Sequence, residues 1–279
     1  MKFNIFLMVI DSLQARKFYG EKTSLTPNID SLMKKGTYFE NFISACDSSL
    51  LSLTSLFTGK HAFKTGIRSA RYNKLNNNII TYFQILKKSG YHLFGYRPTV
   101  EETVGLIPTF ENKDSDYFYD YDLSNGLGQQ ILDKLDSKLP EPWFFYTHHS
   151  DLHFPVDVPK EFDNEKFGTS KYEQMISSID SWIGKFVEKI DLEKTLFIVT
   201  ADHATFIPSV DVNDKIISFE VDAEKHKISR KMQKRLPESI KPLRTKVFFA
   251  LENIRKKRKK QILKKLNLKP HEERALLWQ

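Results

Sequence analysis

The chain has 279 residues, of which 40% are hydrophobic and 28% charged, and this balance excludes disorder over most of its length. A single cysteine, Cys46, excludes an intramolecular disulfide and any cysteine-rich zinc site. Residues 225–279 hold 19 Lys+Arg and 4 Asp+Glu, which leaves 24 Lys+Arg against 31 Asp+Glu in residues 1–224, so an acidic body precedes a basic tail.

Four apolar runs predict strands that are buried on both faces of a sheet: residues 3–10, 91–95, 143–147 and 195–200. Helical patterns lie between them. Thr26-Pro27 opens a helix that ends before Gly36, and residues 171–190 carry apolar side chains at three- and four-residue spacing. The alternation predicts an α/β fold with a largely parallel sheet.

Three segments depart from this alternation. Residues 97–127 have no clean period and predict a loop or small insertion, and residues 205–223 predict an irregular segment. Residues 247–266 predict a helix with a dense basic face, suited to an anionic membrane surface or another polyanion. A solvated or disordered end is the alternative. We expect peripheral membrane contact through residues 247–279 and no specific nucleic acid partner.

The first apolar run also bears on location. Residues 2–10 are too short to span a bilayer and end in Asp11 instead of a small-residue cleavage site. We therefore expect no signal peptide and no transmembrane helix, and a cytoplasmic location.

Side chains that can bind a metal or transfer a proton follow three of the predicted strands. Asp11 follows the first strand, Asp202 and His203 follow the last, and a richer set follows the third: His148, His149, Asp151 and His153. Ligands of open α/β sheets bind at the carboxyl ends of the strands. Carboxylates with an imidazole suit a divalent cation such as manganese or zinc.

Each of these residues also has an ordinary structural interpretation. A lone aspartate after a strand is most often a helix cap or turn residue. His148 and His149 cannot face the same way if the strand continues through them, so at least one of them is expected to be structural. His153 can equally be a loop histidine.

Five blocks in matching order resemble the sulfatase and alkaline-phosphatase-like superfamily over about residues 3–204. They are Val9-Ile10-Asp11-Ser12-Leu13, Thr26 to Asp30 with Gly36 and Phe39, Ser55 to Lys60, His148 to Pro155, and Tyr172, Asp180 and Ile183-Gly184 leading into Thr195 to His203. The resemblance implies a three-layer sandwich, with residues 1–204 as catalytic core, 205–246 as an irregular remnant of the family's C-terminal part, and 247–279 as a basic helical tail.

The resemblance also implies a nucleophile nine residues before Thr58, which is Ser49. Leu51 and Leu53 stand where formylglycine-type sulfatases carry Pro and Arg, so an unmodified serine is expected. Ser48 is the alternative in a register shifted by one residue, and a purely capping role for this serine-rich stretch stays open.

A metal-bound serine is a coherent nucleophile, because the cation favours its alkoxide. The resemblance implies Asp11, Ser49, Asp202 and His203 as ligands of one divalent ion (manganese, zinc, calcium or magnesium). His153, Lys60, Asp151 and His148 are expected to bind the substrate. Ser12 replaces the second aspartate of many sulfatases, Ala204 replaces a glycine, and the Lys-Trp-His signature is absent, which favours one metal over two.

Two functions therefore remain open from the sequence. The first is a metal-dependent hydrolase or transferase acting on a sulfate or phosphate ester, with the glycan or lipid nature of the substrate resting on family analogy. The second is a catalytically weak family member that binds an anionic partner or membrane through its basic tail.

Overall fold

The computed structural model describes residues 2–18, 22–67, 74–117, 122–153, 156–204, 209–212, 215–218 and 261. The chain divides into two compact units, Met1–Thr205 and Phe206–Gln279. The first unit holds every candidate site residue. The expected helix at residues 247–266 lies outside the described residues, apart from the single helical position 261.

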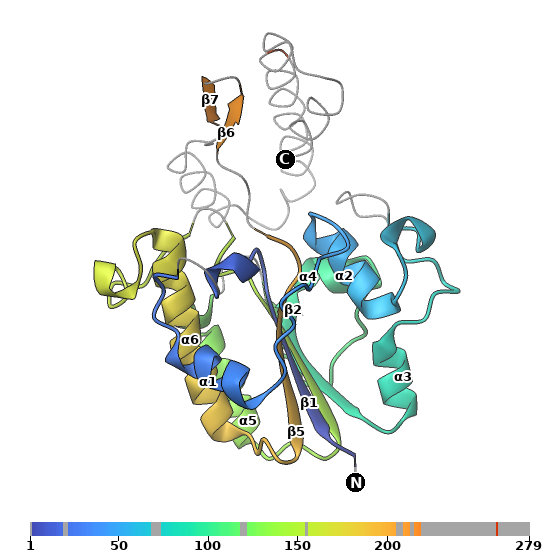
Figure 1. Cartoon of the computed structure of the whole chain (residues 1–279). Coiled ribbons are helices and arrows are strands. Elements are labelled where there is room, and N and C mark those ends of the chain that lie inside the picture. Colours follow the sequence, from blue (N-terminus) through green and yellow to red (C-terminus); the bar gives the residue numbers. More distant parts are fainter. Residues whose placement is uncertain are drawn as a thin grey trace, which may run out of the picture. The chain divides into compact units, whose positions relative to one another are not determined.

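The first unit is built on a parallel sheet with the strand order β3-β2-β4-β1-β5. Its four longer strands coincide with the four predicted apolar runs: β1 (Asn4–Ile10), β2 (His92–Pro98), β4 (Trp143–His149) and β5 (Thr195–Ala201). A two-residue strand, β3 (Asp116–Tyr117), pairs with the end of β2. All four long strands point the same way, so their carboxyl ends share one edge (Figure 1).

Helices cover both faces of the sheet and give the three layers that were expected (Figure 1). One face carries α1 (Pro27–Lys35), α5 (Leu127–Asp136) and α6 (Lys171–Lys189), and the other carries α2 (Ser49–Thr58), α3 (Tyr82–Lys88) and α4 (Thr99–Thr103). Single 3-10 turns complete the unit at η1 (Ala15–Lys17), η2 (Ala62–Lys64), η3 (Leu123–Asn125) and η4 (Glu165–Phe167).

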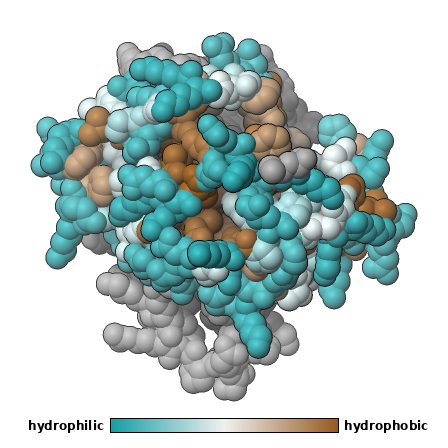
Figure 2. Space-filling model, turned by 90° about the horizontal axis from the view of Figure 1, so that it is seen from below, coloured by the Kyte–Doolittle hydropathy of each residue, from teal (hydrophilic) through white to brown (hydrophobic). Residues whose placement is uncertain are grey.

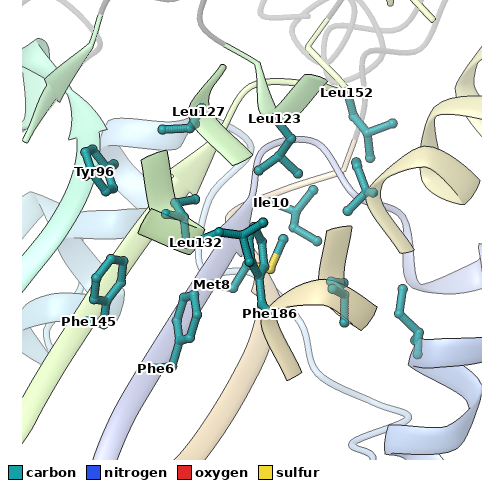
Figure 3. Close-up of a cluster of buried hydrophobic side chains, with 14 of the residues drawn as sticks. Phe6, Met8, Ile10, Tyr96, Leu123, Leu127, Leu132, Phe145, Leu152 and Phe186 are labelled. Atoms are coloured by element: carbon teal, nitrogen blue, oxygen red, sulfur yellow. The ribbon is translucent and has the colours of Figure 1, made fainter. Parts of the chain in front are cut away.

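Side-chain alternation along β1 and β4 divides the core into two. Phe6, Met8 and Ile10 point into the core beneath α1, α5 and α6, where Phe145 and Phe186 join them (Figure 3). Leu7 and Val9 point to the opposite core, together with Leu53, Phe57, Phe144 and Tyr146. Strands that are apolar on both faces are what a parallel sheet between two helical layers requires. We call the first layer the α6 face and the second the α2 face.

The segments without clean period contain more regular structure than expected. Residues 97–127 hold the end of β2, the short helix α4, the short strand β3 and the turn η3. In the second unit, β6 (Ser209–Val212) and β7 (Lys215–Ser218) form an antiparallel hairpin where an irregular segment was expected. The β-branched residues Val210, Val212, Ile216 and Ile217 flanking Asn213-Asp214 are the overlooked hairpin signal.

Hydrophilic side chains dominate the end of the molecule seen from below, where the strands begin, although an apolar strip crosses it (Figure 2). Within the described residues, no helix is both long and apolar enough to cross a membrane. The side chains that can bind a metal or transfer a proton gather at the opposite end, where the strands finish.

Candidate active site

The turns after β1 and β5 bring two aspartates and a histidine together. Ligand atoms of Asp11, Asp202 and His203 lie within 4.8 Å of one another. His203 Nε2 is 3.8 Å from Asp11 Oδ1 and 3.4 Å from Asp202 Oδ2. Both aspartates are buried, whereas His203 is partly exposed. The neighbouring parallel strands β1 and β5 end in register, and this juxtaposes the residues that follow them.

Asp202 is held by the backbone and still has one oxygen free. Its Oδ1 accepts hydrogen bonds from the main-chain N–H of Ser12 (3.1 Å) and of His203 (2.7 Å). Its Oδ2 is buried and has no hydrogen-bond partner in the described structure. A buried carboxylate oxygen without a donor is costly unless a cation satisfies it. Asp202 therefore fits a metal ligand.

Ser12 fixes the turn that carries Asp11. Its backbone has a positive φ of 65°, and its hydroxyl donates to Asp11 Oδ1 at 2.6 Å. Its carbonyl accepts a hydrogen bond from the Tyr172 hydroxyl (2.6 Å), which in turn accepts from the main-chain N–H of Gln14 (2.9 Å). The residue that replaces a second aspartate thus helps to hold the first one in place.

The ring of His203 presents one defined nitrogen to the site. Its Nδ1 lies 2.7 Å from the carbonyl oxygen of Ala204, which can only accept, so Nδ1 carries the proton when the ring is neutral. The lone pair on Nε2 is then available to a cation. In the described structure Nε2 lies 3.0 Å from Ser49 Oγ.

Ser49 is the first residue of α2 and its hydroxyl is directed at His203. The helix follows Ser48, which is extended (φ −142°, ψ 133°) and makes no side-chain capping hydrogen bond, and it ends at the left-handed Gly59. Main-chain N–H groups in the first turn of a helix have no intrahelical acceptor and favour anions. The hydroxyl, the metal-type cluster and a helix N-terminus therefore meet at one place.

Two expected substrate contacts lie elsewhere. Lys60 is exposed and follows the C-terminal end of α2, and ten helical residues span about 15 Å, so the structure separates it from Ser49. Asp151 is buried and accepts from the main-chain N–H of Leu123 at 3.2 Å. Burial, and then the charge of Asp122, raises the pKa of Asp151 well above its usual range. Its side chain holds a loop.

The histidines after β4 separate into different environments. His153 lies in the turn that follows the strand, where its main-chain N–H donates to Ser150 O at 2.9 Å, and its side chain is partly buried. His149 is fully buried with Nε2 2.8 Å from Thr147 Oγ1, and burial followed by the charge of His148 lowers its pKa to about 3. His149 is thus the structural member of the adjacent pair.

His148 faces the site but is buried. Its Nδ1 lies 2.5 Å from Glu101 Oε1, and its Nε2 lies 3.7 Å from Asp202 Oδ2. Burial disfavours its charged form, but the charge of Glu101, with smaller contributions from Asp202 and Asp11, raises its pKa to about 9. Glu101 was missed from the sequence because it lies in the segment without periodicity, and Tyr172 was named as part of the helix of residues 171–190 and of the family resemblance, without a role in holding the Asp11 turn.

Comparison with known proteins places this geometry in context. The family model described as Sulfatase matches residues 3–228. Human N-acetylgalactosamine-6-sulfatase is 25% identical over 269 residues, covering 74% of this chain and 51% of the relative. The chain thus spans about half the length of that curated relative.

Solved structures with the same fold are matched over a larger share of their own length than that relative. Phosphonate monoester hydrolase of Agrobacterium radiobacter has a TM-score of 0.61 at 14% identity, with 73% of this chain and 63% of that chain covered. A protein of the alkaline phosphatase superfamily from Vibrio parahaemolyticus has a TM-score of 0.54 at 22% identity, with 79% and 61% covered. These likenesses concern the fold.

Proposed function

This chain belongs to the sulfatase family, and from that membership and the geometry of its site we propose that it cleaves a sulfate or phosphate ester through Ser49 at one divalent metal ion. The observation that carries the proposal is the 3.0 Å separation of Ser49 Oγ from His203 Nε2, beside the paired carboxylates of Asp11 and Asp202. A helix cap would direct this hydroxyl at its own backbone instead.

The donor set fits a divalent cation. Asp11, Asp202 and His203 would hold it, with the Ser49 hydroxyl as a fourth donor, and two carboxylates with one imidazole suit manganese or zinc as well as harder ions. Bound there, the cation would lower the pKa of the serine hydroxyl and polarise the ester oxygens. Ser12 and Tyr172 keep the Asp11 turn in place while this happens.

The chemical step is a displacement at sulfur or phosphorus. Ser49 Oγ would form a bond to the central atom as the bond to the leaving oxygen breaks. The serine proton would pass to solvent, and the leaving oxygen would take a proton from solvent and depart as the alcohol. The N–H groups that open α2 would stabilise the charge on the non-bridging oxygens. Water would then release sulfate or phosphate from Ser49 in a hydrolase, whereas an acceptor hydroxyl would take the group in a transferase.

An unmodified serine suits this site better than formylglycine does. Leu53 is fully buried in the core of the α2 face, and Leu51 packs against the same core, at the two positions where the family's formylglycine signature requires Arg and Pro. Ser49 lacks the neighbours that mark a residue for conversion. We therefore propose the serine side chain itself as the nucleophile, with His153 as the substrate contact that the resemblance implies.

The test is turnover by the full chain reconstituted with Mn²⁺ or Zn²⁺. Matched aryl sulfate, aryl phosphate and phosphodiester substrates, and a sulfated N-acetylgalactosamine, should reveal one preferred ester. Ser49→Ala should reduce turnover by more than about a thousandfold, as expected for loss of a nucleophile. Thermal stability should change little, because Ser48 and not Ser49 occupies the N-cap position, and the Ser49 hydroxyl is directed at His203 in a partly exposed position.

Two serines of the same segment serve as controls. Ser48→Ala tests the shifted register, and Ser55→Ala removes a hydroxyl that only bonds back to Leu51 O within the helix. Both variants should keep near-normal turnover. Loss of activity in Ser48→Ala with retention in Ser49→Ala would shift the nucleophile by one residue, and retention in both would end the proposal of covalent catalysis.

A further inference from the structure

A buried line of three side chains runs from α4 to the proposed metal ligand Asp202. Glu101 contacts His148 Nδ1 at 2.5 Å, and His148 Nε2 faces Asp202 Oδ2 at 3.7 Å. The three side chains are 1%, 4% and 0% exposed respectively, so none of them is available to solvent. Tyr146 adds a hydrogen bond of 3.2 Å to the second oxygen of Glu101.

The orientation of His148 is set by Glu101. A carboxylate can only accept, so Nδ1 of His148 carries a proton and Nε2 is the nitrogen left to face the site. Neither Nε2 nor Asp202 Oδ2 has a hydrogen-bond partner in the described structure, although both are buried and face one another. Buried polar atoms normally have a hydrogen-bond partner, so a nitrogen and a carboxylate oxygen that face one another without one indicate that a further group completes the site.

The imidazole of His148 lies between two buried acidic side chains. Glu101 is next to its Nδ1 and Asp202 faces its Nε2, and buried carboxylates persist only when they are paired. The ring therefore connects the carboxylate of α4 to the proposed metal ligand.

His148 does not itself complete the ligand set. The group of mutually close ligand atoms found in the described part of the chain comprises Asp11, Asp202 and His203, without His148. Its side chain is only 4% exposed, which leaves little surface for the direct substrate contact that the sequence suggested. Its remaining role is to contact Asp202 and orient it, without binding the metal or the substrate.

We propose that Glu101 and His148 are positioning residues that hold Asp202 in its metal-binding orientation, with Glu101 fixing the imidazole and the imidazole placed against Asp202 Oδ2. The proposal rests on the metal site of the proposed function. Outer partners that orient ligands typically contribute 10–100-fold to metal affinity. Glu101 therefore belongs to the site although it touches neither metal nor substrate.

The experiment measures Mn²⁺ binding to the metal-free full chain by isothermal titration calorimetry. Glu101→Gln keeps the size of the side chain and removes its charge, and it should weaken binding about 10–100-fold. Glu102→Gln is the matched control, because this neighbour on α4 pairs with Arg97 at 3.0 Å and its side chain is 38% exposed. It should bind Mn²⁺ like the wild type.

A double-mutant cycle separates positioning from general damage. In a His148→Gln background, Glu101→Gln should produce no further loss of affinity, because Glu101 acts through His148. Equal losses in both backgrounds, or unchanged affinity in Glu101→Gln, would overturn the inference while leaving the metal site intact. A wild-type chain that binds no Mn²⁺ would overturn the inference and the proposed metal chemistry together.

A measurement on the wild type covers the case in which Glu101→Gln does not fold. Nitrogen-15 spectra of histidine-labelled protein should show His203 Nε2 binding Zn²⁺, while the His148 ring binds no Zn²⁺ and keeps the proton on Nδ1. Coordination of Zn²⁺ by His148 would make it a ligand and would contradict the positioning role. Loss of the His148 Nδ1 proton in the zinc-bound protein would contradict the contact with Glu101.

Discussion

The two faces of the sheet use buried polar groups for different purposes. On the α6 face, Asp180 accepts from the main-chain N–H groups of Asn28 and Ile29, and Asp151 accepts from that of Leu123. On the α2 face, the buried carboxylate of Glu101 contacts a side chain, His148, that faces the proposed metal ligand. Carboxylates on the α6 face bind main-chain N–H groups, whereas the carboxylate of Glu101 on the α2 face orients a side chain of the proposed site.

The adjacent histidines at the end of β4 show the same division within one dipeptide. Strand alternation sends His148 to the α2 face and His149 to the α6 face. The pKa of His148 rises to about 9 beside Glu101, whereas burial lowers that of His149 to about 3. Identical side chains one residue apart are thus prepared for opposite charge states by what packs against them.

The largest difference between the faces should appear when Asp202 is changed. Asp202→Asn removes a charged ligand and should reduce Mn²⁺ affinity by more than roughly 100-fold. That is the largest loss expected for a residue that only orients a ligand. His149→Gln, on the other face, should leave affinity unchanged. Calorimetric titration of both variants checks this, and comparable losses in the two would show that the faces are not functionally separate.

The pH dependence of folding should follow from His149. Its folded pKa of about 3 lies below the ordinary value near 6.5, so the unfolded chain takes up a proton between these values that the folded chain does not. This contribution to stability is present above pH ~6.5 and falls by about 1.4 kcal/mol per unit as the pH drops.

Urea unfolding of metal-free protein at several pH values measures the effect. His149→Gln should reduce the slope of the unfolding free energy against pH between about pH 6.5 and 4.5. The reduction should correspond to the uptake of up to one proton on unfolding. His148 should contribute with the opposite sign, since its raised pKa gives stability that is present below about pH 6.5 and is lost as the pH rises towards 9. Identical slopes in wild type and His149→Gln would refute the assigned environment.

Asp180→Ala should separate stability from metal binding. Asp180 accepts from two main-chain N–H groups and from the Asn28 side chain at the start of α1, so its loss should cost about 1–2 kcal/mol, as for other helix caps. Mn²⁺ affinity should remain that of the wild type. A loss of affinity at unchanged stability is the result that this account does not allow.

Tyr172→Phe should give the smallest loss of Mn²⁺ affinity among the variants that are expected to change it. It removes the hydrogen bonds to Ser12 O and from Gln14 N–H, each contributing about 1 kcal/mol. Because these bonds hold the turn that carries Asp11, we also expect a loss of a few-fold in Mn²⁺ affinity. Unfolding and titration of the same preparation measure both, and an unaffected affinity would limit Tyr172 to structural support.

The site was predictable from sequence where it depends on strand ends. Apolar runs located the four long strands, and parallel strands place their following residues on one edge, so Asp11, Asp202 and His203 could be grouped. The family spacing to Thr58 then singled out Ser49.

The sequence did not predict which face of the sheet a strand residue points to, or which residue an aperiodic segment brings to the site. Glu101 lies in a segment without a period, and only the fold shows that α4 returns it to His148. Which of His148 and His149 faces the site depends on the register of β4. Lys60 was expected near the ester, but α2 separates it from Ser49. Motif spacing in the sequence does not show this distance.

The central claim is that side chains from three separate elements form one metal-dependent centre around Ser49. Anomalous diffraction from crystals grown with Mn²⁺ tests it most directly. We predict a single peak about 2.0–2.6 Å from Asp11, Asp202 and His203 Nε2, with Ser49 Oγ in the same coordination sphere. No peak at this site, or a peak that leaves out Asp202 or His203, would contradict the account.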